Sequence, residues 1–153
     1  MINAVPTWPR LLGIAGLLPQ IACLGAAVVG GLEWRYFAVA VGWAYAALIF
    51  SFLGGLWWGL AAARLASGQT QAPRWIWIAS VMPSLLALAS FLPWLVAMPW
   101  PGPSLVALGV AIIASLLVDR RLVGLAPDWW MDLRRPLSLG LGGLSIALGL
   151  LAP

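Results

Sequence analysis

The 153-residue sequence is too apolar for a water-soluble domain, because 63% of its residues are hydrophobic and only 8% are charged. Soluble proteins carry about 25% charged residues. The formal net charge is +4, but the basic residues are all arginines that lie between apolar segments, which indicates membrane topology and not nucleic-acid binding. Cys23 is the only cysteine, so no intramolecular disulfide can form, and the lack of histidine excludes histidine ligation of haem.

Taken in chain order, the apolar segments predict an all-α fold, a polytopic membrane bundle of five transmembrane helices in one integral membrane domain, residues 1–153. The fourth segment is short for a bilayer, so a full crossing stays open there. Pro19 should interrupt the first span, and Pro83 should kink the third span. Residues 127–133 predict a short interfacial helix before the last span, which should begin at Pro136. The five spans are residues 11–32, 37–63, 75–97, 104–118 and 136–152.

The second span carries a row of small residues at i, i+4 spacing. In lipid, such a row lets another helix approach closely enough for dense van der Waals contact. We interpret it as a helix-packing face and favour an internal contact over a dimer interface, because every helix of a small bundle needs neighbours. The row consists of Ala47, Ser51, Gly55, Gly59 and Ala63.

The arginines are distributed unevenly between the two sides of a five-span topology. All except Arg35 fall on the side that holds the N-terminus. Positive residues mark the cytoplasmic side of membrane proteins. The sequence therefore predicts a multi-pass protein of the bacterial inner membrane, or of the mitochondrial inner membrane, with the N-terminus cytoplasmic (or in the matrix) and the C-terminus outside.

Several sequence segments together resemble a known family. The most specific is the Ser-Phe-Leu-Gly-Gly run that begins at Ser51, with the Trp-Trp-Gly of residues 57–59 after it. Further matching segments are residues 17–19, 82–87, 117–120 and 127–137. On these motifs the chain is similar to the uncharacterised multi-pass membrane family called domain of unknown function 3429, which includes transmembrane protein 69. The resemblance implies a bundle of about five helices in a bacterial inner or mitochondrial membrane, and it implies no settled activity.

Most of the eleven tryptophans fall near span ends, Trp129 and Trp130 among them, as in the aromatic belt of ordinary membrane proteins. Deeper aromatic and polar residues are candidates for a pocket that holds a flat hydrophobic ligand. Simple packing is the alternative, and we favour it. The candidates are Gln20, Trp43, Trp57, Trp58 and Pro83. For Gln20 we favour a hydrogen bond to another helix, at Ser51 or at the carbonyl freed by Pro83.

Charged residues at the predicted span ends are candidates for ion pairs and for contacts with anionic lipid headgroups. We expect Asp119 to pair with Arg64 or Arg10 on the same rim, and the adjacent Arg134 and Arg135 to bind headgroups. The set comprises Arg64, Asp119, Arg120, Arg121, Arg134 and Arg135.

No arrangement of residues typical of catalysis is found, because serines lack a histidine partner and carboxylates are few. We therefore expect a non-enzymatic integral membrane protein, an accessory or assembly subunit that packs against a larger inner-membrane, energy-transducing complex. The alternative is binding or transport of a small hydrophobic ligand such as a lipid, quinone or tetrapyrrole. Expected partners are membrane lipids and other membrane subunits, with no nucleic acid, metal or cofactor; a bound lipid or pigment stays open.

Overall fold

The computed structural model describes residues 5–68, 72–122 and 124–153, and these residues form helices without strands. The predicted all-α class is confirmed. The elements are α1 Thr7–Ala15, α2 Leu18–Val29, α3 Leu32–Ala66, α4 Arg74–Ala89, α5 Leu92–Leu95, α6 Gly102–Ala114, α7 Leu116–Asp119, the 3-10 helix η1 Arg120–Leu122, and α8 Trp130–Leu150.

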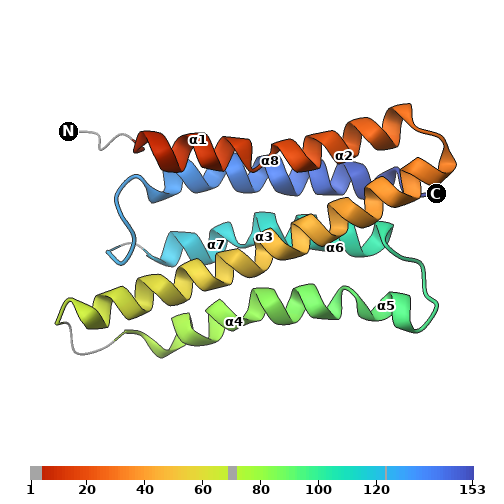
Figure 1. Cartoon of the computed structure of the whole chain (residues 1–153). Helices are drawn as coiled ribbons and strands as arrows, with labels where there is room; N and C mark the ends of the chain where they lie inside the picture. Colours follow the sequence, from red (N-terminus) through yellow and green to blue (C-terminus); the bar gives the residue numbers. More distant parts are fainter. Residues whose placement is uncertain (1–4, 69–71, 123) are drawn as a thin grey trace.

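The helices lie side by side as long rods, and α3 crosses the others obliquely (Figure 1). Helices α1 and α2 continue one another along one edge, with α8 beside them. Helix α6 packs along α8, while α3 packs along α4 and α2. The described N-terminal segment lies at one end of the bundle and the C-terminus at the other (Figure 1).

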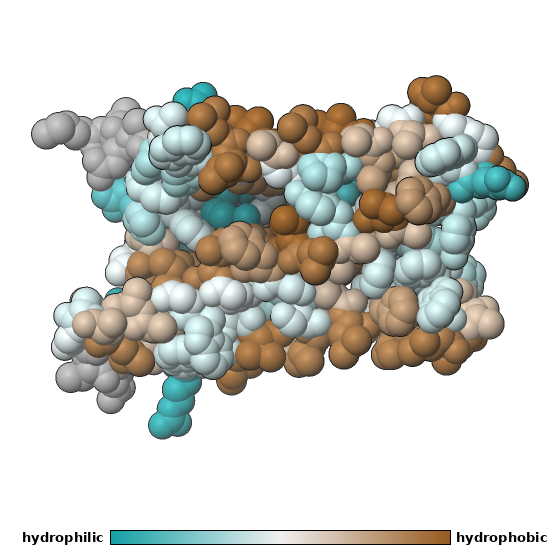
Figure 2. Space-filling model, in the orientation of Figure 1, coloured by the Kyte–Doolittle hydropathy of each residue, from teal (hydrophilic) through white to brown (hydrophobic). Residues whose placement is uncertain are grey.

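Four stretches within the described residues are long and apolar enough to cross a membrane, namely Thr7–Val29, Leu32–Ala66, Arg74–Leu95 and Gly102–Leu122. Large apolar side chains also cover much of the outer surface (Figure 2). Both features are compatible with a multi-pass membrane protein. Helix α8, the predicted fifth span, is not among the four, and its first turns carry Asp132, Arg134 and Arg135.

The first span is broken between α1 and α2, as Pro19 predicts. Pro19 lies in the first turn of α2, where its missing N–H is not needed. The chain turns at Gly16 and Leu17, and the hydroxyl of Tyr45 on α3 donates a hydrogen bond to the carbonyl of Gly16. A side chain of the neighbouring helix thus satisfies a carbonyl at the break.

Several helices extend beyond the predicted spans. Helix α3 begins at Leu32, not at residue 37, and its 35 residues make it about 52 Å long at 1.5 Å per residue. The fourth span is not short, because the stretch Gly102–Leu122 has 21 residues. There is no separate interfacial helix before the last span: α8 starts at Trp130 and continues through Pro136. Proline there removes only one hydrogen bond, the bond to the Asp132 carbonyl.

Helix α4 continues through Pro83 to Ala89. The third span is interrupted further along, at Ser90 and Phe91, before the short helix α5, in which Pro93 occupies the first turn.

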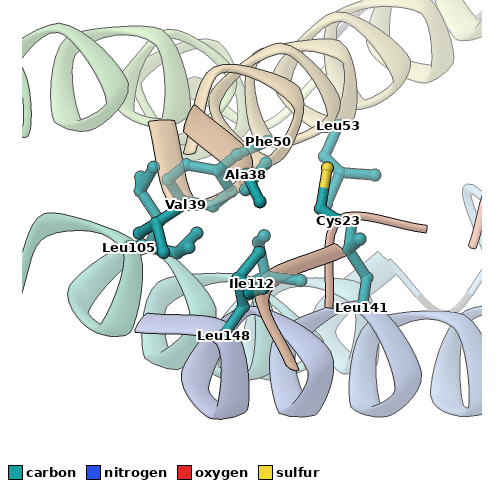
Figure 3. Packing of buried hydrophobic residues seen from close by; sticks show 12 residues of the cluster. Cys23, Ala38, Val39, Phe50, Leu53, Leu105, Ile112, Leu141 and Leu148 are labelled. Atoms are coloured by element: carbon teal, nitrogen blue, oxygen red, sulfur yellow. The ribbon is translucent and has the colours of Figure 1, made fainter. Parts of the chain in front are cut away.

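The core lies where α2, α3, α6 and α8 meet, and its side chains point toward one another (Figure 3). It includes Cys23, Val39, Phe50, Leu53, Leu105, Ile112, Leu141 and Leu148. Glycines bring the backbones together: a Cβ atom on Gly109 of α6 would lie 2.7 Å from the carbonyl oxygen of Gly142 on α8. Close backbone approach of this kind is how helices gain contact in lipid.

Candidate functional site

A buried carboxylate lies at the N-terminal end of the bundle. Asp119, the last residue of α7, is only 1% exposed. Its Oδ1 atom accepts hydrogen bonds from the indole Nε1 of Trp57 at 2.9 Å and of Trp130 at 3.1 Å. Its Oδ2 atom accepts one from Nε of Arg134 at 2.9 Å, which is also an ion pair. A carboxylate can remain charged inside an apolar bundle when donors and an opposite charge surround it in this way.

Arg134 extends this network to a further helix. Its Nη2 atom donates to the hydroxyl of Ser115 at 3.3 Å, and that hydroxyl donates to the Ile112 carbonyl at 2.6 Å. We call Asp119, Arg134, Trp57, Trp130 and Ser115 the Asp119 cluster. The cluster joins α3, the α6–α7 rod and α8. Both carboxylate oxygens of Asp119 accept hydrogen bonds from the protein. This arrangement favours a structural ion pair over a role in proton transfer.

The predicted rim ion pairs are therefore wrong for Asp119, whose partner is Arg134 and neither Arg64 nor Arg10. Arg134 reaches Asp119 because α8 starts at Trp130 and places residue 134 one turn inside the bundle. Arg64 lines a different hollow, between the end of α3 and Gly124.

The remaining cations of the predicted set point outward. Arg120, Arg121 and Arg135 are exposed, whereas Arg134 is 6% exposed. The adjacent arginines of α8 are thus divided between the surface and the interior, and only Arg135 can meet a lipid headgroup.

Trp130 and Ser115 are members of the cluster that the sequence reasoning missed. Trp130 was interpreted as a belt residue, but it is 9% exposed and donates to Asp119. The feature of the sequence that could have indicated Trp130 is the Asp119 carboxylate. An acid beside an apolar segment needs hydrogen-bond donors, and an indole N–H is a donor with no acceptor capacity. The sequence did not indicate which of the tryptophans would supply it.

The candidate ligand-pocket residues are not brought together. Trp43 donates to Ser90 at 3.0 Å and packs its ring against Phe91 and Trp100, with centroid distances of 5.5 and 5.1 Å. Trp57 belongs to the Asp119 cluster, and residue positions 43 and 57 are separated by about 21 Å of helical rise along α3. Trp58 is half exposed and contacts Trp77.

Pro83 of the same set packs against Gly54, far along the bundle from Trp43. Gln20 is fully buried, and its Nε2 atom donates to the hydroxyl of Ser145 on α8 at 3.0 Å. The expected hydrogen bond from Gln20 to another helix is present. Its partner is Ser145, and neither Ser51 nor the carbonyl freed by Pro83. It ties α2 to α8.

The small-residue row of α3 is divided: Ala47 packs against the core, but the later part of the row does not form an internal contact. Gly55, Gly59 and Ala63 are exposed, and a Cβ atom added to either glycine would meet nothing within 4 Å. The helix instead packs through Gly54, where an added Cβ atom would lie 2.1 Å from the carbonyl oxygen of Ser80 on α4. Ala47 and Ser51, at the start of the row, are half-buried.

A pocket of about 410 Å³ lies between α1, α3 and α8. Figure 2 shows hydrophilic atoms at the floor of a hollow beneath α1. The lining is largely apolar, but it includes Arg134 of the Asp119 cluster and Ser138, one turn further along α8. We call this the α1–α3–α8 pocket.

Comparison with known proteins identifies one family. The family described as "Protein of unknown function (DUF3429)" matches residues 5–151. Neither the curated proteins nor the solved structures give a significant match. Within the described residues, no group of His, Cys, Asp or Glu is placed to hold a metal ion.

Proposed function

Because the chain belongs to the DUF3429 family, whose function is unknown, we propose a role from the geometry of its surface. The protein is a non-enzymatic accessory or assembly subunit of a larger inner-membrane, energy-transducing complex. A transmembrane helix of another subunit docks on the exposed small residues of α3, Gly55, Gly59 and Ala63, which we call the docking row.

The observation that carries the proposal is the outward-facing row of Gly55, Gly59 and Ala63 on α3. These positions lie in the second candidate span, so the row faces the lipid phase, and a Cβ atom added to Gly55 or Gly59 would meet nothing within 4 Å. A small-residue face in lipid makes little van der Waals contact with acyl chains and much more with a closely packed helix. Phe52 and Trp58 are exposed beside the row and supply the large side chains that would border a docked helix.

The non-enzymatic part of the proposal is supported by how the buried polar groups are used. The Asp119 carboxylate is bonded at both oxygens, and Gln20 and Trp43 each donate to a serine of another helix segment. These groups hold helices together. A general acid or base must come within hydrogen-bond reach of a substrate, whereas these groups are bonded to neighbouring helices.

The proposal includes a location and an orientation. We place the protein in a bacterial or mitochondrial inner membrane, with the N-terminus on the cytoplasmic or matrix side. The arginine distribution supports this assignment. Membrane lipids contact the remaining apolar surface.

Purification in native nanodiscs through an N-terminal tag tests the docking face. We expect a stoichiometric membrane partner to co-purify with the wild-type protein. Replacing Gly55→Leu and Gly59→Leu together should reduce the recovered partner at least about tenfold, because the added side chains keep a docked backbone at a distance.

Gly143→Leu is the matched control. Gly143 is also an exposed helical glycine with open space around it, but it lies on α8, so this variant should retain the partner. Recovery of a lone wild-type chain would contradict the proposal. So would a second copy of the chain as the only partner, or equal retention in both variants.

A further inference from the structure

We propose that the α1–α3–α8 pocket binds a neutral, apolar molecule of the membrane phase through a carbonyl oxygen. This inference does not depend on the docking row, although Phe52 lies at the edge of the pocket and also beside that row.

The size and lining of the pocket suit a small apolar group. Its volume is about 410 Å³, within the range of ligand pockets in proteins. Leu17, Leu53 and Leu141 line it from three different helices or their junctions, and Trp129 closes one end. These side chains can contact a ring or chain but cannot hydrogen-bond to it, except through the indole N–H.

Two polar groups identify where the ligand's oxygen would lie. Ser138 is 1% exposed, yet its hydroxyl has no hydrogen-bond partner among the described residues. Leaving a buried hydroxyl unpaired is costly, and more so away from water. Arg134 lies one turn earlier on the same face of α8, and its bonds to Asp119 and Ser115 use two of the five N–H donors of a guanidinium. Both groups can therefore donate to one acceptor.

The charge of the site favours a neutral acceptor over an anion. The positive charge of Arg134 is matched by Asp119 at 2.9 Å, so the pair has no net charge. A carboxylate or phosphate brought into the pocket would be desolvated beside Asp119 without a cation of its own. A carbonyl oxygen needs only the donors.

The pocket can be reached from the lipid phase. Helix α1 has no buried residue, and it contacts α8 where Leu137 packs under Gly13. At the edge of the pocket, Leu12 and Phe52 are 66% and 59% exposed. A molecule that moves laterally in the membrane can thus enter between α1 and α3 without passing through water.

Two sources provide this chemistry, a quinone ring carbonyl and the ester carbonyl of an acyl lipid. The test uses the full-length protein in nanodiscs with two photoreactive probes, a short-tailed benzoquinone bearing a diazirine and a diacylglycerol with a diazirine on one acyl chain. We expect one probe to label α1, α3 or α8 at pocket residues saturably, which identifies the source.

Two matched pairs of variants test the contacts. Ser138→Ala should weaken the apparent affinity about fivefold, the value of one hydrogen bond, whereas Ser84→Ala, at an exposed serine of α4, should leave it unchanged. Leu137→Phe should fill the pocket and reduce labelling at least about tenfold, whereas Leu139→Phe on the exposed face of α8 should not. The Gly55→Leu, Gly59→Leu double variant should label like the wild type.

Several results would overturn the inference. These are the absence of saturable labelling in the pocket by either probe, equal labelling of Leu137→Phe and Leu139→Phe, and unchanged affinity in Ser138→Ala. Melting temperatures of all variants check that they are folded. If Leu137→Phe does not fold, the conservative Ser138→Ala and Ser84→Ala pair decides the question.

Discussion

Asp119 shows at the scale of single residues how an acid can be kept inside an apolar bundle. Two indole donors and one guanidinium surround its two oxygens. The donors come from α3 and α8, so the carboxylate also fixes the relative positions of these two helices. Its structural value is thus tied to the charge on Arg134, with which it forms an ion pair.

Removing the carboxylate should therefore destabilise the bundle strongly. Asp119→Ala leaves the buried guanidinium of Arg134 without a counter-ion, and breaking one side of a buried pair costs about 3–5 kcal/mol. Thermal unfolding in detergent, followed by near-ultraviolet circular dichroism, measures the loss. A second variant replaces both members of the pair, Asp119→Leu together with Arg134→Met. It should recover most of the stability that Asp119→Ala loses, since neither charge then remains buried.

Asp132→Ala provides the matched control, because Asp132 is an exposed acid in the first turn of α8. Its effect should stay within about 0.5 kcal/mol, as for other surface positions. Equal effects of the two alanine substitutions would show that the ion pair does not stabilise the fold.

At the scale of helices, α3 illustrates the limit of reading packing faces from sequence. In a soluble protein the apolar face of a helix marks the core, but lipid is as apolar as a leucine side chain. Phe52 and Leu53 are both apolar, yet Phe52 is 59% exposed and Leu53 is 3% exposed. The sequence could therefore predict helices, approximate spans and the break at Pro19. It could not predict which face of α3 meets α4.

Gly54 and Gly55 also lie on different faces of α3 although they are adjacent in sequence, because successive helical positions differ by about 100° around the helix axis. Gly54→Ala would force its Cβ atom against the Ser80 carbonyl and push α3 from α4, at a cost of about 1–3 kcal/mol. Gly55→Ala meets open space and should be neutral or stabilising by up to about 1 kcal/mol, because alanine is the better helix former. In detergent, Gly54→Ala should lower the melting temperature and Gly55→Ala should leave it unchanged or raise it; a similar drop in both would refute the assigned face.

At the scale of the whole molecule, α8 explains why composition alone does not identify every span. Arg134, Ser138 and Ser145 lower its hydropathy, but all three are buried among other helices. Ser145 bonds to Gln20, and Arg134 to Asp119. These three polar residues thus face the bundle, while Leu139 and Leu150 face outward. The charged residues Asp132 and Arg135, in the first turns of α8, are exposed. The helix runs alongside α2 and α6 (Figure 1), as a fifth crossing would.

Accessibility of introduced cysteines tests this fifth crossing together with the orientation. Cys23 is buried and should give little background with a membrane-impermeant thiol reagent. In intact cells, Ser67→Cys should be protected until the membrane is permeabilised, whereas Met98→Cys and Pro153→Cys should be labelled from outside; all three positions are exposed. If Pro153→Cys behaves like Ser67→Cys while Met98→Cys labels, α8 does not cross. If the whole pattern is reversed, the arginine-rich side is the outer one, and the positive-inside assignment is wrong.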